Sequence, residues 1–243
     1  MEADEYRKMA GVEDAMWYYR ALHRNVGLAL AQDAPTGGIR VLDAGCGTGG
    51  LMRRLQRAQS GWELTGVDFS PLACAFARER TGRPVREGSV TALPFADADF
   101  DAVASCDVVC QVTEPLAALR EFHRVLRPGG IAVLTMPAYR WMHSYHDRAV
   151  GNLRRYSRGE TVALLRQAGF RIERATYWNT LLFPLAVLQR KLLRGRDSSS
   201  DVRLYPAPVE AFCNAMNLIE HAWLRRGGVL PWGNSVLAVG RRP

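Results

Sequence analysis

The stretch that decides the fold is Val41-Leu42-Asp43-Ala44-Gly45-Cys46-Gly47-Thr48-Gly49-Gly50. Apolar residues lead into an acidic residue and a glycine-rich corner, and the run that follows has helical character. This order predicts a strand that turns sharply into a helix. The three alternating glycines have no Cβ, so a ligand can approach the backbone of the corner and the free N–H groups of the helix behind it. The stretch therefore predicts a nucleotide site.

The glycine spacing narrows the kind of nucleotide. A dinucleotide fingerprint reads G-x-G-x-x-G, whereas this chain has G-x-G-x-G directly after Asp43. A second acidic residue, Asp68, ends the next predicted strand 25 residues later, where its carboxylate can accept both hydroxyls of a ribose. An ordinary tight turn explains the glycines alone, but it does not explain Asp68 at that spacing.

At these residues the chain resembles the class I S-adenosylmethionine-dependent methyltransferases. The resemblance rests on LDAGCGTG at 42–49 and GVDFS at 66–70. It implies that S-adenosyl-L-methionine is the cofactor, that Gly45 and Gly47 lie beside its amino-acid part, and that Asp68 holds its ribose. Asp43 and Phe69, which belong to the same two motifs, are expected at the cofactor as well.

The loop at 87–95 is similar to the family motif G-D-A-x-x-L-P-F. In that motif the aspartate bonds the adenine amino group, and Ser89 stands in its place here. A serine accepts this hydrogen bond more weakly than a carboxylate does. Val90 is expected to form the apolar wall of the adenine pocket. The departure at Ser89 puts the affinity for the cofactor in question.

The segment 106–112 resembles a family stretch that commonly reads D-V-L-E-H-V. Cys110 and Gln111 replace its Glu-His pair. The resemblance places Cys106 and Asp107 next to the methionine half of the cofactor. Asp107 is also a candidate base, although a capping or structural role is the favoured interpretation.

The N-terminal segment 6–32 has apolar residues near helical spacing and predicts one or two helices. In the methyltransferases that the chain resembles, an N-terminal helix with a Glu-x-x-x-Trp pattern folds over the cofactor cleft as a lid. Glu13 and Trp17 match this pattern. Trp17, Tyr18 and Arg20 are therefore candidates for closing the site, unless the aromatic residues form the buried stripe of a packing helix.

Strand-like and helix-like segments alternate along the chain, which predicts a parallel, doubly wound sheet with ligands at the carboxyl ends of its strands. We expect an α/β, Rossmann-like sheet of seven strands, mostly parallel, with the antiparallel last strand of the class I fold. The predicted strands are 39–44, 63–68, 84–87, 100–105, 131–136, 170–177 and 235–240.

A length of 243 residues with 48% hydrophobic content suits one large core. We expect a single methyltransferase domain over 1–243. Its parts are an N-terminal helical lid at 1–34, a cofactor-binding core at 35–136, a substrate-side loop and sixth strand at 137–178, a helical insertion at 179–232 and the last strand at 233–243.

Candidate acid-base groups gather in 138–157, beyond the fifth predicted strand. Histidine titrates near the pH that a proton acceptor needs, so His143 and His146 are candidate catalytic residues. Three residues apart on a helical turn, they would face the same way, and Asp147 would orient one of them. Surface or structural roles are the alternative for both histidines.

The run 146–156 resembles a pattern H-D-x-x-x-G-H-x-R-R-Y of bacterial type 11 methyltransferases, with Asn152 in place of the second histidine. Its arginines and Tyr156 suit the binding of a carboxylate or phosphate, or the bracing of the next helix. Tyr156 is also placed among the catalytic candidates. The substrate-binding candidates are Tyr139, Trp141, Arg155 and Asn179.

The segment 181–194 is apolar and ends in basic residues. It suits a lid or dimer helix that packs on the domain, or an amphipathic helix in peripheral contact with a membrane. The polar stretch 195–201 is expected to be a linker.

The net charge and the cysteine content limit the binding partners and the cellular compartment that are expected for the protein. The formal net charge is +8 and the pI about 9.6, which suits nucleic acid, anionic lipid or an acidic substrate, and also the arginine usage of a GC-rich genome. Five cysteines without metal-ligand spacing indicate a reducing compartment, and no metal is expected. No run of 18 apolar residues occurs, so we expect a cytoplasmic protein.

These features predict methyl transfer from S-adenosylmethionine to a small-molecule or lipid-like acceptor, in specialised metabolism, with a histidine base. A homodimer is an open alternative. RNA methylation fits the charge, but no RNA-binding module is recognisable, so nucleic acid is not the expected partner. A third hypothesis is a protein that binds S-adenosylmethionine and catalyses a different reaction.

Overall fold

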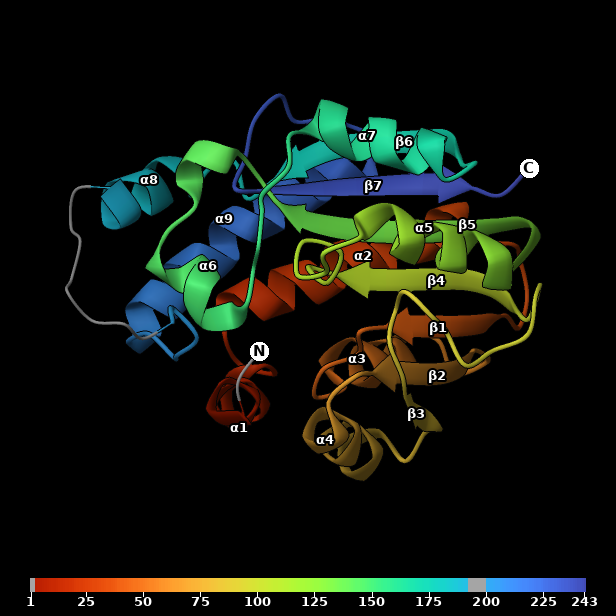
Figure 1. Ribbon diagram of the computed structural model, residues 1–243. Helices are drawn as coiled ribbons and strands as arrows, with labels where there is room; N and C mark the ends of the chain where they lie inside the picture. The colour runs from red at the N-terminus through yellow and green to blue at the C-terminus, as the bar shows by residue number, and fades with distance from the viewer. Residues whose placement is uncertain (1–2, 192–199) are drawn as a thin grey trace.

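Within residues 3–191 and 200–243, which the computed structural model describes, seven strands form one sheet between two layers of helices (Figure 1). The strand order is β3-β2-β1-β4-β5-β7-β6, and β7 runs antiparallel to both of its neighbours. The predicted fold class is confirmed. The strands are β1 (Arg40–Ala44), β2 (Glu63–Asp68), β3 (Val85–Glu87), β4 (Phe100–Cys106), β5 (Leu126–Pro137), β6 (Arg171–Trp178) and β7 (Ser235–Arg241).

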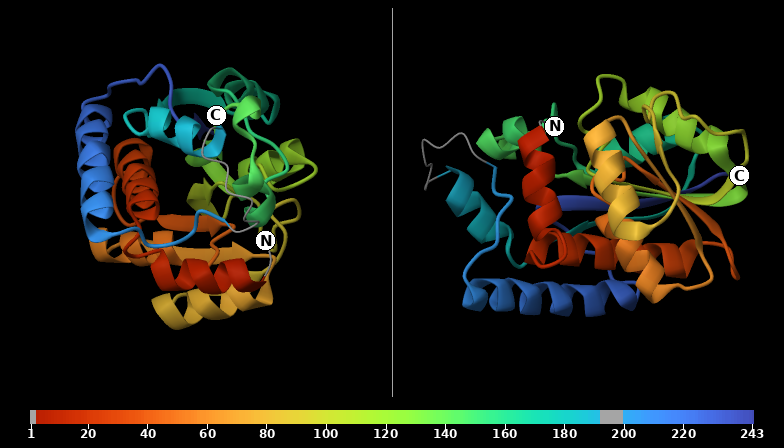
Figure 2. Two further views of the ribbon diagram at one scale, coloured as in Figure 1. Left: turned by 90° about the vertical axis from the view of Figure 1, so that its left-hand side faces the viewer. Right: turned by 90° about the horizontal axis from the view of Figure 1, so that it is seen from below.

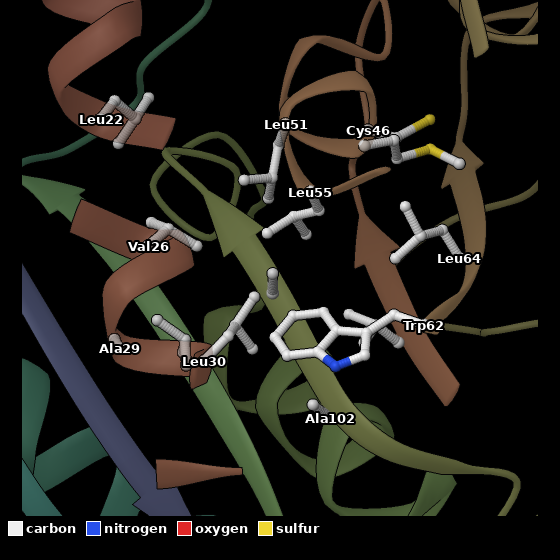
Figure 3. Packing of buried hydrophobic residues seen from close by; sticks show 14 of the residues in the cluster. Leu22, Val26, Ala29, Leu30, Cys46, Leu51, Leu55, Trp62, Leu64 and Ala102 are labelled. Atoms are coloured by element: carbon white, nitrogen blue, oxygen red, sulfur yellow. The ribbon is translucent and has the colours of Figure 1, made fainter. Parts of the chain in front are cut away.

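Helices cover both faces of the sheet, and each face has its own buried apolar cluster. One face carries α2 (Trp17–Asp33), α3 (Gly50–Ala58) and α4 (Pro71–Thr81), with α9 (Ala207–Arg225) packed outside α2 (Figure 2). Leucines of α2 face those of α3 in this cluster (Figure 3). The opposite face carries α5 (Pro115–Val125) and α7 (Arg158–Gln167).

The remaining helices gather where β1, β4 and β5 end (Figure 1; Figure 2, left). They are α1 (Ala3–Val12), the 3₁₀ turn η1 (Arg140–Met142), α6 (Tyr145–Val150) and α8 (Phe183–Lys191). In this part of the fold, they cover the edge of the sheet at which a doubly wound fold binds its ligands.

The glycine corner adopts the conformation that its sequence predicts. Gly45, Gly47 and Gly49 have φ angles of 83°, 51° and 86°, in the left-handed region that favours glycine. A Cβ on Gly45 would lie 2.3 Å from a methyl carbon of Val108. A side chain at this position would therefore force apart the two loops that follow β1 and β4.

Some helices are capped at their first turn by a residue next to them in the sequence, and one is capped by a distant residue. Ser70 caps α4, and Ser157 forms a capping box with Glu160 at the start of α7. Helix α2 has no side-chain cap of its own; instead the backbone N–H of Trp17 donates to the carboxylate of Glu210 on α9 at 2.7 Å. Helix α2 is thus tied to a residue that lies 193 positions later in the chain.

The predicted helix over 181–194 is α8, which begins at Phe183 and ends at the basic pair Arg190 and Lys191, while residues 192–194 and most of the expected linker lie outside the described residues. In the described ranges, no helix has the length and apolarity needed to cross a bilayer.

Candidate functional site

A cavity of about 710 Å³ lies at the carboxyl ends of the strands, between the glycine corner and α8. It brings together most of the residues that the sequence singles out. Those that line it are Trp17, Asp43, Gly45, Gly47, Asp68, Phe69, Ser89, Val90, Cys106, His146, Arg155 and Asn179, whereas Arg20, Tyr139, Trp141, His143 and Tyr156 do not line it.

Asp68 ends β2 and lines the cavity beside the glycine corner, where the sequence predicts the cofactor. Its carboxylate accepts hydrogen bonds from the N–H groups of Gly47 and Ser70, at 2.9 and 3.0 Å, and from the hydroxyl of Tyr6 at 3.3 Å. A carboxylate has about four lone-pair directions, so these three donors leave one free for a ligand hydroxyl. The contact with Tyr6, on α1, has no signal in the local sequence.

Asp43 is an ionisable group without a counter-charge. It is 3% exposed, and its Oδ2 has no hydrogen-bond partner in the described part of the chain. Burial, with the nearby charges of Glu13 and Asp68, raises the pKa of Asp43 to about 8. A ligand that brings a donor or a positive charge would satisfy this carboxylate. The amino-acid part of S-adenosylmethionine, which carries an ammonium and a sulfonium, fits that requirement.

Glu13 joins the N-terminal helices to the glycine corner. Its buried carboxylate accepts from the hydroxyl of Thr48 at 2.5 Å and from the guanidinium of Arg80 at 2.6 Å. Trp17, one turn later, reaches the cavity, as a lid residue should. Arg20 is exposed on the outer side of α2, so the structure does not bring this side chain over the cofactor end.

The expected adenine end of the cavity holds Val90, which is buried, and Phe69, which is 59% exposed. The hydroxyl of Ser89 lies 2.8 Å from that of Thr91 and accepts from the Thr91 N–H. The serine that replaces the family's aspartate is therefore already engaged within its own loop, which limits its bonding to a ligand.

Asp107 and Tyr18 form a polar pair at the middle of the cavity. Tyr18 donates its hydroxyl to Asp107 Oδ2 at 2.8 Å, and Thr135 donates to Oδ1 at 3.0 Å. Asp107 has a φ of 57°, a conformation that costs energy in a residue with a side chain and that often marks a functional site. Burial raises its pKa above the ordinary aspartate value.

His146 lines the cavity from α6. Its Nδ1 accepts the backbone N–H of Asp201 at 3.0 Å, so its proton sits on Nε2 when the ring is neutral. Burial and the positive charge of Arg190 lower its pKa to about 4. The imidazole is therefore neutral at pH 7 and presents a hydrogen-bond donor to the cavity, not a proton acceptor.

The two candidate histidines do not share a helical face, which corrects the expectation from their spacing. His143 precedes α6, outside the cavity, and its Nε2 donates to the carbonyl of Asn152 at 3.1 Å. Asp147 orients neither histidine. Its carboxylate instead accepts from Arg155 Nε at 2.8 Å, and both of these side chains are almost fully buried.

The aromatic residues of the substrate-side loop form a separate cluster. Tyr139 stacks on Tyr177 and Trp141, with ring centroids 5.3 and 5.8 Å apart, and contacts Phe183 of α8. This stacking occupies the ring faces on which a substrate would stack. The aromatic cluster also lies outside the cavity. The hydroxyl of Tyr156 is buried away from the cavity and finds no hydrogen-bond partner within the described chain.

Two asparagines lie where β6 ends and β7 begins. Asn179 is 1% exposed with a φ of 58°, and Asn234, which the sequence analysis did not single out, is 8% exposed. Both line the cavity, and neither Oδ1 has a partner among the described residues. Asn234 belongs to the loop before the last strand, so only the pairing of β6 with β7 brings it to the site.

The chain is similar in sequence to known methyltransferases. The family model described as methyltransferase domain matches residues 42–134. The chain is 34% identical over 181 residues to malonyl-[acyl-carrier protein] O-methyltransferase of Erwinia pyrifoliae, over 72% of this chain and 68% of that protein. It is 41% identical over 130 residues to demethylmenaquinone methyltransferase of Thermus thermophilus, over 51% of this chain but only 56% of that protein.

The fold is also similar to that of solved structures. One is a chain of the complex between the Haloferax volcanii Trm112 methyltransferase activator and a methyltransferase, with a TM-score of 0.66, 23% identity and full coverage of both chains. Together with the strand order and the glycine corner, these relatives establish the family and its cofactor, S-adenosylmethionine. The chain belongs to the class I S-adenosylmethionine-dependent methyltransferases.

Proposed function

We propose that the protein methylates a small-molecule or lipid-like acceptor, which binds beside the cofactor in the same cavity. The observation that carries this proposal is the continuity of the cavity from Asp68 to α8. Its α8 end is walled by the apolar side chains of Leu182, Leu185, Ala186 and Val202. The name of one relative refers to demethylmenaquinone, which supports a lipid-like acceptor, and the name of the other refers to a small malonyl group carried on acyl-carrier protein. A role in specialised metabolism stays a prediction.

The cofactor would be held by the residues of the sequence motifs. Asp68 would take the ribose, Gly45 and Gly47 would admit the amino-acid part, and Asp43 would face its positive charge. Bound S-adenosylmethionine supplies a methyl group on a sulfonium, which a nucleophile must approach in line.

Methylation of a hydroxyl or amine also needs a group that takes the departing proton. The sequence analysis predicts a histidine for this role, and His146 is the candidate histidine that lines the cavity. Because its Nδ1 already accepts the Asp201 N–H, we propose that His146 donates a hydrogen bond to the acceptor. We propose that Asp107 takes the proton, since burial raises its pKa above the ordinary aspartate value, which makes its carboxylate a stronger proton acceptor, and Tyr18 fixes its orientation.

The proposed function is tested with the purified chain and S-adenosylmethionine labelled in the methyl group. Label should enter small or lipid-like molecules of a cell extract. Asp107→Asn should lower this turnover at least a hundredfold and leave the affinity for S-adenosylhomocysteine within threefold, because proton transfer contributes about 10²–10⁴ in rate. His146→Gln should have a smaller effect. A larger loss in the histidine variant would return the base to His146.

RNA is the second candidate acceptor, favoured by the net charge of +8. The structural neighbour from Haloferax volcanii was solved in complex with the Trm112 activator. A protein partner is therefore a further candidate for this chain. Label that enters RNA, with binding that weakens steeply between 50 and 200 mM salt, would support this reading over the first.

Two proposals concern the whole chain. Because one sheet contains strands that begin at Arg40 and end at Arg241, we propose a single domain over 1–243. We also propose a homodimer through the outer face of α9, where Phe212, Ile219 and Trp223 are more than half exposed. Leu185 and Leu188 of α8, 52% and 42% exposed, instead favour the predicted membrane contact through 181–194.

A further inference from the structure

The α8 end of the cavity contains two arginines with unused hydrogen-bonding capacity. Arg190, on α8, is 8% exposed, and its Nη1 is buried with no partner among residues 3–191 and 200–243. Arg155 uses Nε on Asp147 and Nη1 on the carbonyl of Ala138, at 2.8 and 3.0 Å, and the described chain offers no partner to its Nη2. Both side chains line the cavity.

The carboxylates around these arginines are already occupied. Asp147 accepts from Ser144, Asn152 and Arg155. Asp201 accepts from Tyr145 at 2.7 Å and from Gln189 at 3.2 Å, and it lies 3.5 Å from Arg190 Nη2.

Donors therefore remain without acceptors on this wall of the cavity. Arg190 Nη1 is buried without a partner, and the hydrogen bonds of Arg155 and His146 within the described chain use Nε, Nη1 and Nδ1, which leaves Arg155 Nη2 and His146 Nε2 for a ligand. The two guanidinium groups are close enough that the charge of Arg190, after burial, contributes to lowering the pKa of Arg155. Buried donors without partners destabilise a protein unless a ligand or water supplies the acceptors. An oxyanion supplies several acceptor atoms and a compensating negative charge at once.

The surroundings of this donor group are apolar. Leu182, Ala186 and Val202 line the same end of the cavity, and Leu185 and Val209 line it while also being about half exposed, at 52% and 42%. The apolar wall thus continues to the surface between α8 and α9. An apolar portion of a ligand can leave the cavity along this path without entering water at once.

We propose that the acceptor carries an oxyanionic group, a phosphate or a carboxylate, joined to an apolar portion, and that Arg190 and Arg155 bind the oxyanion. This inference deepens the proposed function and rests on it, because it assigns the α8 end of the cavity to the acceptor. Arg155 is anchored by Asp147 and presents a fixed surface, while Arg190 adds the second set of donors. The cluster selects for charge, and the apolar wall selects for the attached chain.

The test is calorimetry on the full chain saturated with S-adenosylhomocysteine, which keeps the cofactor end filled. The probes share a ten-carbon chain: decyl phosphate, decanoate, decanol and decyltrimethylammonium. We expect decyl phosphate and decanoate to bind at least tenfold more tightly than decanol, and decyltrimethylammonium more weakly than decanol. Inorganic phosphate alone should bind at least tenfold more weakly than decyl phosphate; equal affinities would overturn the apolar part of the proposal.

Arg190→Gln should remove the preference for the two anionic probes and leave the affinity for decanol within twofold. Arg148→Gln is the matched control, because Arg148 lies on α6 but is exposed and does not line the cavity. The proposal is overturned if Arg190→Gln keeps a tenfold preference for decyl phosphate. It is also overturned if that variant instead loses affinity for S-adenosylhomocysteine, which would make Arg190 a partner of the cofactor's carboxylate.

These binding measurements do not depend on turnover. If the probes bind as expected but no small molecule is methylated, the anion site stands and the proposed function fails. If small molecules are methylated but the anionic probes bind no better than decanol, the proposed function stands and the inference fails.

Discussion

Tyr6 occupies a hydrogen-bonding position on Asp68 that the second hydroxyl of a ribose needs. Its hydroxyl donates to Asp68 Oδ1 over 3.3 Å, a long bond, and it comes from α1. A bound ribose would replace this donor, so the enzyme must give up the Tyr6 contact when the cofactor enters. A net hydrogen bond contributes roughly 1 kcal/mol.

Tyr6→Phe should therefore tighten the binding of S-adenosylmethionine by about fivefold, which corresponds to ~1 kcal/mol. Calorimetry on the wild-type and variant chains measures this directly. Asp68→Ala is the opposite control and should abolish binding. A weaker affinity in Tyr6→Phe would mean that the tyrosine stays in place and contacts the ligand.

Asp43 makes the stability of the cofactor-free protein depend on pH. Its pKa is 3.8 in the unfolded chain and about 8 in the folded one, so the folded state holds the extra proton between these values. The contribution to stability is complete below pH 3.8 and is lost as the pH rises towards 8. The loss amounts to about 1.4 kcal/mol per pH unit within that window.

Asp43→Asn removes this titration. We expect urea unfolding at pH 5, 6 and 7 to show that the free energy of unfolding of the variant, relative to that of the wild type, rises by about 1.4 kcal/mol per pH unit. Saturating S-adenosylmethionine should shrink that slope, because a cation beside Asp43 favours its charged form. A constant difference between the two proteins would contradict the buried, protonated state of Asp43.

Two departures from the family patterns lie in contact. Cys110 stands where the resembled motif has a glutamate and Asn152 where it has a histidine, and the Cys110 thiol donates to Asn152 Oδ1 at 3.2 Å. The two positions are 42 residues apart, so neither motif alone reveals the pairing. The fold thus brings the two departures into direct contact in this chain.

At the scale of the elements, the start of α2 depends on a distant residue. The Trp17 N–H donates to Glu210, and the carboxylate also lies at the positive end of the α2 dipole. Glu210→Ala should lower the free energy of unfolding by about 0.5–2 kcal/mol, the usual effect of losing a helix cap. Glu79→Ala, an exposed carboxylate on α4, is the matched control and should change it by less than about 0.5 kcal/mol. Equal effects in urea unfolding would refute the capping role.

The elements that carry their own signals were predictable from the sequence. The glycine corner, the Ser70 cap and the Ser157 capping box each rest on a few adjacent residues, and the alternation of strands and helices predicted the parallel core. The site was predictable mainly in its expected cofactor half, where Asp68 ends a strand, and on the substrate side only His146, Arg155 and Asn179 of the candidates line the cavity. Tyr6, Arg190 and Asn234 reach the cavity from segments whose positions depend on packing, and no local pattern marks them.

At the scale of the whole molecule, α9 forms an outer edge of the fold (Figure 2). Its inner face packs on α2, where His221 Nδ1 lies 3.0 Å from Asn25 Oδ1. On the outer face, Phe212, Met216, Ile219 and Trp223 follow a spacing of four, three and four residues. This is the heptad spacing of a seam between two helices, and a second copy of α9 matches it by symmetry.

Sedimentation velocity at micromolar concentration should therefore show a dimer. Ile219→Glu should dissociate it, because the side chain is 58% exposed, lies in the middle of the seam and would place a charge opposite its copy. Leu188→Glu, on the exposed side of α8, should leave the dimer intact. A monomeric wild type would contradict the interface. If that monomer sediments with anionic vesicles and Leu188→Glu releases it, the apolar surface serves a membrane instead, because a charge on a buried apolar face opposes insertion.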